Sequence, residues 1–129
     1  MLFRSPDTLE SMANLASTYW KQGRWNEAEQ LEIQVMDMTK KLLGAEHPYT
    51  LSSMGNLART YRNQGRWNEA EKLEIQVMDM TKKLLGAEHP HTLTSMRNLV
   101  YTYRHQRKDC EAEKLELEIM NINIRLGRN

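Results

Sequence analysis

The sequence has little of what disulfide-bonded, secreted or membrane-spanning proteins require. Its 129 residues include one cysteine, Cys110, so an internal disulfide cannot form and a reducing compartment suits the chain. The opening residues MLFRS hold no apolar stretch long enough for a signal peptide. No apolar run approaches the roughly 18 residues needed to cross a bilayer. These absences favour a cytoplasmic protein without a membrane segment.

An excess of charge of one sign is also missing. The chain has 18 Lys and Arg residues against 17 Asp and Glu, and its net charge is +1. Bulk charge therefore draws the chain neither to nucleic acid nor to a membrane surface. Any electrostatic recognition has to come from the local sorting of charges.

Catalytic and metal-binding motifs are absent as well. The four histidines form no HExxH motif and have no cysteine partner at ligand spacing; they are His47, His89, His91 and His105. The chain contains no GxxxxGK(S/T), GxGxxG or GxSxG. Glu27, Glu29 and Glu32 are more simply the solvated face of a helix than acid/base pairs. We predict no metal, no cofactor and no enzyme activity.

What the chain does contain is a repeat. Residues 23–48 (GRWNEAEQLEIQVMDMTKKLLGAEHP) return at 65–90 with one change, Gln30 to Lys72. Aligning residues 5–46 with 47–88 gives a period of 42 residues with eight differences, and residues 89–129 form a third, looser copy. We predict a single array of three units over residues 1–129. Its abrupt start inside a repeat suggests a segment of a longer protein.

Each unit is predicted to form two helices joined by a short turn. Apolar residues recur at three- and four-residue steps, which places them on one face of a helix. In the first helix of unit one, the predicted core residues are Leu9, Met12, Leu15, Ala16 and Tyr19. In the second helix they are Ala28, Leu31, Val35, Met38 and Leu42. Units two and three repeat both stripes, and their second-helix stripes end at Leu84 and Leu126.

Residues that bind free backbone groups indicate the helix ends. Glycine tolerates the left-handed conformation that stops a helix, which makes Gly23 and Gly44 the expected ends. Proline suits the first position of a helix, as at Pro6. The predicted N-caps are Ser5, His47 and His89 for the first helices, then Asn26 in a capping box with Glu29, and Asp109, for the second helices.

These residues resemble the tetratricopeptide repeat. The matching stretches are Asn14-Leu15-Ala16, Tyr19, Gln22-Gly23-Arg24-Trp25, Glu27-Ala28 and the joint Leu43-Gly44…His47-Pro48. The 42-residue period and the LLGxxHP joint are similar to the kinesin-light-chain-like subclass and to the C-terminal repeats of many fungal NACHT/NB-ARC-type receptors. The resemblance implies an all-α fold, an α-α superhelix (solenoid) of three helix-turn-helix units with six antiparallel helices. It also implies that the first helices line a concave groove.

The first two copies disagree mainly on one face of the first helix. Six of their eight differences lie there, at Asp7, Glu10, Ala13, Ser17, Trp20 and Lys21. At 100° per residue these positions span an arc of about 140° opposite the predicted core. Drift of exposed positions is the alternative, but the second helix also has a solvated face and differs at one position only. We favour a diversified binding face.

This face carries arginines, aromatic residues and a repeated asparagine. Arginine pairs with carboxylates and stacks on aromatic rings, and large aromatic side chains dominate binding hot spots. An asparagine amide can both donate to and accept from a peptide backbone, or alternatively bond to a neighbouring helix. The predicted peptide-binding residues are Asn14, Trp20, Lys21, Asn56, Arg59, Arg62, Arg97, Asn98, Tyr101, Arg104 and His105.

The pattern suits a non-catalytic protein–protein interaction module that binds an acidic, partly apolar peptide in the groove of the first helices. An alternative is a scaffold that self-associates head to tail, because the end of unit three resembles the surface onto which unit one would stack. Nucleic-acid binding is less favoured, because the net charge is near zero and the face includes Asp7 and Glu10. The expected partner is a protein, an acidic peptide or a second copy, and no membrane is involved.

Overall fold

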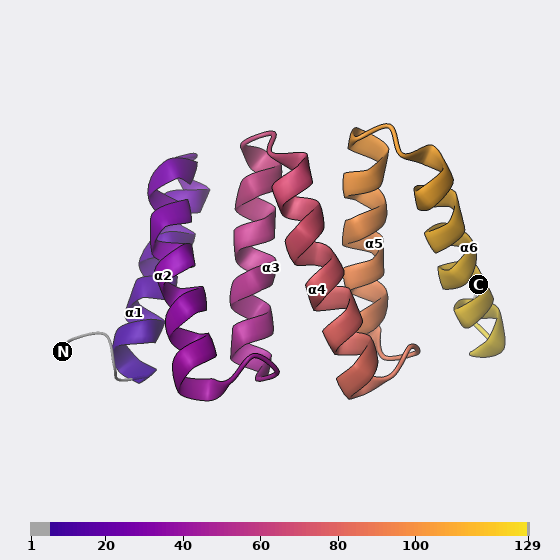
Figure 1. Ribbon diagram of the computed structural model, residues 1–129, viewed down its shortest axis with the longest axis horizontal. Coiled ribbons are helices and arrows are strands. Elements are labelled where there is room, and N and C mark those ends of the chain that lie inside the picture. Colours follow the sequence, from indigo (N-terminus) through magenta and orange to yellow (C-terminus); the bar gives the residue numbers. More distant parts are fainter. Residues whose placement is uncertain (1–5, 129) are drawn as a thin grey trace. The chain divides into compact units, whose positions relative to one another are not determined.

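The structure is a computed structural model that describes residues 6–128, with side chains from Thr8 onward. Over this range the chain is all-α, as predicted, and forms no strand (Figure 1). The helices of the described range are α1 (Pro6–Lys21), α2 (Trp25–Leu43), α3 (Pro48–Asn63), α4 (Trp67–Leu85), α5 (Pro90–His105) and α6 (Asp109–Arg125). Each repeat therefore supplies the two helices expected of it.

The helices pack into two compact units, numbered 1 and 2, whose boundaries differ from those of the three sequence repeats. Unit 1 (Met1–Arg66) holds α1, α2 and α3, and unit 2 (Trp67–Asn129) holds α4, α5 and α6. In unit 1, α2 packs antiparallel against both α1 and α3; in unit 2, α5 packs antiparallel against both α4 and α6 (Figure 1). Consecutive helices thus pack within each unit as in an α-solenoid. A single array over residues 1–129 stays a prediction.

Each unit buries an apolar core between its helices. The buried apolar residues of unit 1 are Leu9, Met12, Ala16, Ala28, Val35, Met54, Leu57 and Ala58. Those that cluster in unit 2 are Leu93, Met96, Leu99, Leu115, Ile119 and Ile122, with Ile75, Met78 and Val100 packed against them. Burial of apolar surface is the main stabilising force for such helix layers.

Two predicted core positions are wrong. Leu15 is 45% exposed, although its counterparts Leu57 and Leu99 are each 1% exposed. Leu57 lies on α3 against α2, and Leu99 lies on α5 against α4, so these positions are buried by the preceding repeat. The leucine that ends each second-helix stripe is also exposed, at Leu42, Leu84 and Leu126. Helices α2 and α4 instead bury polar residues beside their buried alanines, Glu32 and Thr39 on α2 and Glu74 and Thr81 on α4.

The helix starts follow two different rules. His47 and His89 cap α3 and α5 as predicted: each ring Nδ1 accepts a hydrogen bond of 3.0 Å from the backbone N–H two residues later. The predicted caps Asn26 and Asp109 are wrong, because α2 and α6 begin one residue after Arg24 and Lys108, which make no side-chain cap bond. Ser5, the other predicted cap, lies outside the described residues.

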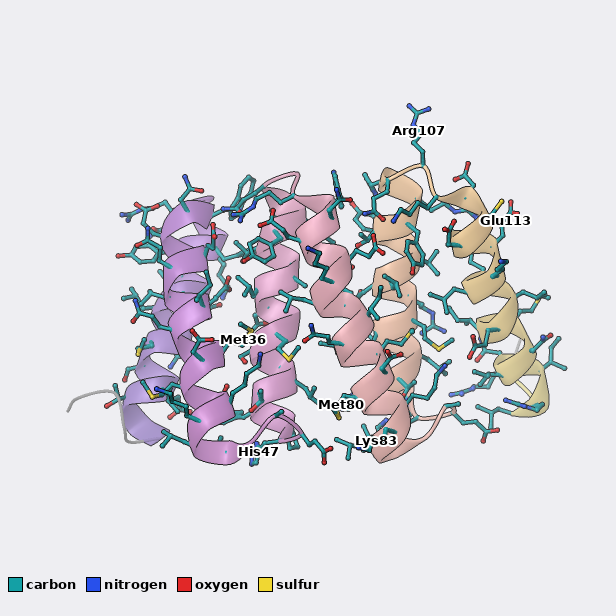
Figure 2. All side chains as sticks on the ribbon, in the orientation of Figure 1. Met36, His47, Met80, Lys83, Arg107 and Glu113 are labelled. Atoms are coloured by element: carbon teal, nitrogen blue, oxygen red, sulfur yellow. The ribbon has the colours of Figure 1, made fainter. Side chains whose placement is uncertain are left out.

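The turns between the two helices of a repeat need a left-handed residue. Gly23 and Gly65 supply it, each with φ of 76°. At the equivalent place in the third repeat, Arg107 adopts φ of 63°, and its side chain extends away from the helices (Figure 2). This conformation is unfavourable for a residue with a Cβ atom but easy for glycine.

We predict that Arg107→Gly raises the free energy of unfolding by about 1 kcal/mol, because glycine adopts the left-handed turn without steric strain. Urea denaturation at equilibrium measures the change. The matched control is Gly65→Arg in the second repeat, which should lower stability by a similar amount. An Arg107→Gly protein no more stable than the wild type would contradict the account.

Candidate functional site

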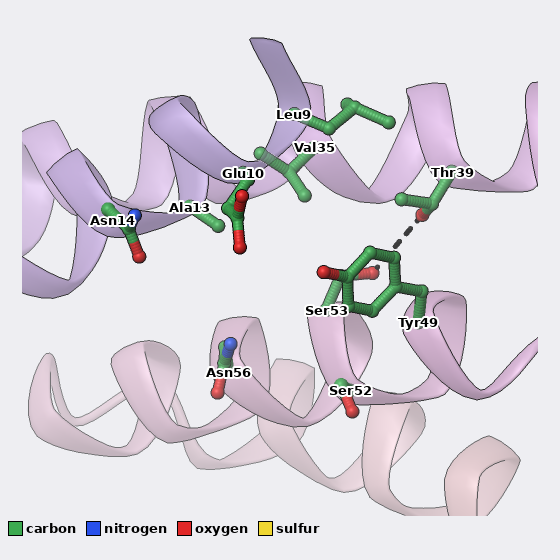
Figure 3. Close-up of a pocket in the computed structure, with 10 residues that line it drawn as sticks. All are labelled: Leu9, Glu10, Ala13, Asn14, Val35, Thr39, Tyr49, Ser52, Ser53 and Asn56. Carbon is green, nitrogen blue, oxygen red and sulfur yellow. Dashed lines mark hydrogen bonds between the residues drawn. The ribbon is translucent and has the colours of Figure 1, made fainter. Parts of the chain in front are cut away.

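A hollow opens in unit 1 between α1 and α3, the two first helices that carry much of the predicted binding face. Its volume is about 240 Å³. The residues that line it are Leu9, Glu10, Ala13 and Asn14 from α1, Val35 and Thr39 from α2, and Tyr49, Ser52, Ser53 and Asn56 from α3 (Figure 3). Variable and unchanged positions therefore meet in one concave surface.

A second hollow of about 110 Å³ continues the first. The two share Ala13, Val35, Ser53 and Asn56 among their lining residues. The second adds Ser17 from α1, Glu32 from α2 and Arg59 from α3. We name the two together the α1/α3 groove. One end carries the Glu10 carboxylate and the exposed Tyr49 ring, and the other carries the Arg59 guanidinium.

Two of the predicted asparagines line the groove from facing helices. Asn14 and Asn56 are both exposed (Figure 3). Within the described residues, the side-chain amides of Asn14, Asn56 and Asn98 bond to no neighbouring helix. The alternative structural explanation for the repeated asparagine is therefore not supported. Each amide keeps its donor and acceptor for another molecule.

Trp20 and Arg59 meet in direct contact. The Arg59 guanidinium carbon lies 3.8 Å from the centroid of the Trp20 ring, a cation–π arrangement, and both side chains are half-buried. Burial lowers the pKa of Arg59, while the nearby Glu32 carboxylate raises it. The stack fixes the cation at one end of the groove.

Glu32 is the groove residue that the sequence interpretation missed. The sequence pattern predicts it on a solvated face; this prediction is wrong, because Glu32 is 5% exposed and accepts a hydrogen bond of 2.5 Å from the Thr60 hydroxyl. Burial raises its pKa from 4.5 to about 7, and the Thr60 bond and the Arg59 charge partly oppose this rise. The spacing of Ala28, Glu32 and Val35 along one helical face was the available signal.

The same hydrogen bond recurs in unit 2, where Glu74 is 5% exposed and accepts a bond of 2.5 Å from the Thr102 hydroxyl. In both units the bond joins the second helix of one repeat to the first helix of the next, a contact that we call the repeat joint. Glu29 is also predicted on the solvated face, but at the joint it accepts hydrogen bonds from Gln64 at 3.0 Å and Arg66 at 2.7 Å. These carboxylates hold helices together.

The remaining predicted residues of unit 1 lie near the Arg59 end. Lys21 is exposed at the last turn of α1, and Arg62 is half-buried on α3, one turn beyond Arg59. Both stay predicted residues of the binding face.

In unit 2, α5 presents its predicted residues on an exposed surface. Arg97, Asn98 and Tyr101 are exposed, with Tyr101 at 51%. His105 stacks on Trp67 with ring centroids 4.2 Å apart, and the Tyr101 ring lies 4.3 Å from that of His105. The α5 surface is therefore aromatic as well as basic.

Arg104 differs from the other predicted arginines because it already has carboxylate partners. Its guanidinium lies 2.5 Å from a Glu116 oxygen and 3.4 Å from an Asp109 oxygen, both on α6. The Glu116 bond is the main cause of the raised pKa of Arg104. An acidic ligand at Arg104 has to compete with these two groups.

Other kinds of site find no support in the described part of the chain. Among its residues, no group of three or more His, Cys, Asp or Glu side chains is placed to hold a metal ion. None of the helices in this part combines the length and apolarity of a membrane-crossing segment. Cys110 is exposed, with no disulfide partner.

Comparisons with known proteins agree with the geometry. The profile of the tetratricopeptide repeat matches residues 7–83 and 60–124. The structure of kinesin light chain nearly identical TPR-like repeats from Podosopora anserina, and that of a single-residue variant, superpose with a TM-score of 0.87 at 33% identity. Our chain is covered entirely and spans 61% of theirs. No curated protein sequence matches significantly.

A more distant structure shares the fold. BtubC (BKLC) from P. vanneervenii superposes with a TM-score of 0.84 at 17% identity, covering 94% of our chain and 48% of its own. The family profile and the two 33%-identical structures confirm the kinesin-light-chain-like resemblance. The similarity to fungal NACHT/NB-ARC-type receptors stays a prediction.

The raised pKa of Glu32 predicts a pH dependence of stability. A carboxyl whose pKa is higher in the folded state than in the unfolded state binds its proton more tightly when folded. Its contribution is therefore full below about pH 4.5 and is lost as the pH rises through about 7. From pH 5 to pH 8 we expect the wild type to lose on the order of 2 kcal/mol relative to Glu32→Gln.

Urea denaturation of both proteins at each pH measures this difference. The matched control is Glu27→Gln on the same helix, since the pKa of Glu27 is lowered by its bond with Arg24. The control should not reduce the loss of stability between pH 5 and pH 8. Parallel pH profiles for the wild type and Glu32→Gln would show that Glu32 titrates normally.

Proposed function

Because the chain belongs to the tetratricopeptide repeat family, we propose that it is a non-catalytic protein interaction module that binds an extended peptide segment in the α1/α3 groove of unit 1. This fold typically serves protein interaction or scaffolding and displays concave surfaces for binding. The observation that carries the proposal is the groove itself, with two uncommitted asparagine amides on facing helices.

The two asparagines suit a peptide backbone. An extended segment presents backbone N–H and C=O groups. The amide oxygens of Asn14 and Asn56 can accept from the N–H groups, and their NH₂ groups can donate to the C=O groups. Such bonds hold the backbone without demanding a particular side chain, so they position the segment rather than select it. The lining residues that differ between repeats then supply selectivity.

Charge in the groove suggests a direction for the ligand. Arg59 lies at one end and Glu10 at the other. A segment with an Asp or Glu side chain at the Arg59 end and an apolar or basic residue near Glu10 and Tyr49 would match both. The acidic, partly apolar ligand expected from the sequence is therefore proposed to carry its acidic residue at the end that meets Arg59.

The α5 surface of unit 2 is a second surface of similar chemistry. Arg97, Asn98 and Tyr101 are exposed along it, and the stacked Trp67 and His105 rings add apolar area. We assign it the same class of ligand, an acidic segment with an aromatic or aliphatic anchor. Nucleic acid is the weaker alternative, because Glu10 lines the groove of unit 1 and net charge is +1.

We predict that peptides with one or two Asp or Glu residues beside a bulky apolar residue bind the wild type. Asn56→Ala should weaken binding about three- to tenfold, because it removes a pair of backbone hydrogen bonds worth roughly 1 kcal/mol. Arg59→Gln should weaken the binding of acidic peptides but leave unchanged the binding of the same peptides with Gln or Asn in place of Glu or Asp. Titration followed by tryptophan fluorescence and calorimetry measures both effects.

The matched control is Asn121→Ala, which removes an exposed asparagine from α6 and should bind as the wild type does. The proposal fails if Asn56→Ala and Asn121→Ala bind equally well, or if no acidic peptide binds the wild type. Binding to a single-stranded oligonucleotide that falls steeply with salt would favour the nucleic-acid alternative instead.

A further inference from the structure

Resting on the function proposed above, we infer that the α1/α3 groove binds the carboxylate of an acidic segment together with one proton, which Glu32 holds. Glu32 and Arg59 line the same hollow, whose volume is about 110 Å³. A ligand carboxylate that reaches the Arg59 guanidinium within this space also approaches the Glu32 carboxyl. The ligand therefore meets a cation and a second acid in one place.

The position of Glu32 is fixed by its burial and by its bond to the next helix. Its side chain is 5% exposed and accepts a hydrogen bond of 2.5 Å from the Thr60 hydroxyl on α3. Turning the carboxyl towards solvent would break this bond between α2 and α3. Two ionised carboxylates in one buried site repel each other, so one of the two holds a proton. Binding of an acidic segment is therefore coupled to a proton.

The groups around Glu32 determine which acid takes that proton. On α2, Glu29 opposes the ionisation of Glu32, and on α3, Arg59 favours it. Glu10, on α1, lines only the first hollow, and the residues of α1 that line the second are uncharged: Ala13, Ala16 and Ser17. Burial has the largest effect and raises the pKa of Glu32 to about 7. A solvated Asp or Glu of a peptide has a pKa of about 4, so Glu32 takes the proton.

Arg59 lacks its nearby counter-charge once Glu32 is neutral. Burial lowers the pKa of Arg59, the Glu32 carboxylate opposes this effect, and the charge of Arg62 adds to it. The Trp20 ring, with its centroid 3.8 Å from the guanidinium carbon, holds Arg59 in place at the end of the groove. A ligand carboxylate can then take the place of the Glu32 charge, so the proton and the acidic segment bind as a pair.

This pairing makes the affinity depend on pH in one direction. Below about pH 7, Glu32 already carries its proton, and the Arg59 charge is available to the ligand. Above about pH 7, binding has to take a proton from solution, so the affinity falls by up to about tenfold per pH unit. A solvated ligand carboxylate, with its pKa of about 4, stays ionised from pH 6 to pH 8. The change in affinity over that range therefore reports on Glu32.

Glu32→Gln tests the inference, because a glutamine amide oxygen can still accept the Thr60 hydrogen bond but cannot take up the proton. The probes are an extended peptide with one Glu beside a bulky apolar residue, and the same peptide with Gln in place of that Glu. The wild type should bind the Glu peptide about tenfold more weakly at pH 8 than at pH 6, and the Gln peptide equally at both. Glu32→Gln should bind each peptide with the same affinity at both pH values.

Calorimetry in two buffers of different ionisation enthalpy counts the protons that binding takes up. At pH 8 the wild type should take up about one proton with the Glu peptide, and Glu32→Gln should take up none. The matched control is Glu27→Gln, at an exposed position on the same helix where the bond with Arg24 lowers the pKa of the carboxyl. This control should behave as the wild type does.

Two further comparisons separate Glu32 from other causes of pH dependence. Equal binding of the Gln peptide at pH 6 and pH 8 shows that the groove stays folded over this range. Glu32→Gln keeps His47 and His105, so a pH dependence that arises from either histidine would persist in this variant.

The inference is overturned, while the proposed function stands, by any of three results. They are a pH dependence that persists in Glu32→Gln, a Glu peptide that binds the wild type equally at both pH values without proton uptake, and a Gln peptide that weakens as much as the Glu peptide. Failure of both peptides to bind at either pH would refute the proposed function, and the inference with it.

Discussion

The arrangement of this protein depends on a glutamate buried at the joint between repeats. Glu32 and Glu74 are each 5% exposed, and a carboxyl so placed is stable only with a bonding partner, which Thr60 and Thr102 provide. The bond admits one register of the following helix on the preceding one. A shift of one residue would leave a polar group buried and unpaired, so the joint sets the spacing at which first helices are displayed.

That spacing creates the groove. With α3 held on α2 by the joint, Asn56 comes to face Asn14 across the hollow, and Arg59 lies beside Glu32 and over the Trp20 ring. The scaffold and the proposed site therefore share residues. Glu32 belongs to both, since it bonds to Thr60 and lines the groove, so a change in its protonation alters the charge beside Arg59 and the stability of the joint together.

The sequence was sufficient for the helices but not for all of their buried faces. Periodicity assigns each helix one apolar stripe, as if it had one neighbour, and this succeeds for Leu9 and Ala16. It fails for Leu15, whose burial depends on a preceding repeat, and for Glu32, because α2 packs against both α1 and α3. The capping box at Asn26 failed for a related reason: Asn26 accepts a bond from Gln64 on the next repeat rather than serving its own helix.

The repeat length, the helix pairs, the histidine caps and the family could be predicted from the sequence, because they depend on local chemistry and on a pattern written almost identically twice. Tertiary packing was needed to show which polar residues are buried, which arginines already have partners and where the groove lies. Arg59 and Arg104 are both predicted on the binding face, yet Arg104 pairs with Glu116 while Arg59 stacks on Trp20. Burial and pairing arise from neighbours far apart in the chain, and helical periodicity carries no information about them.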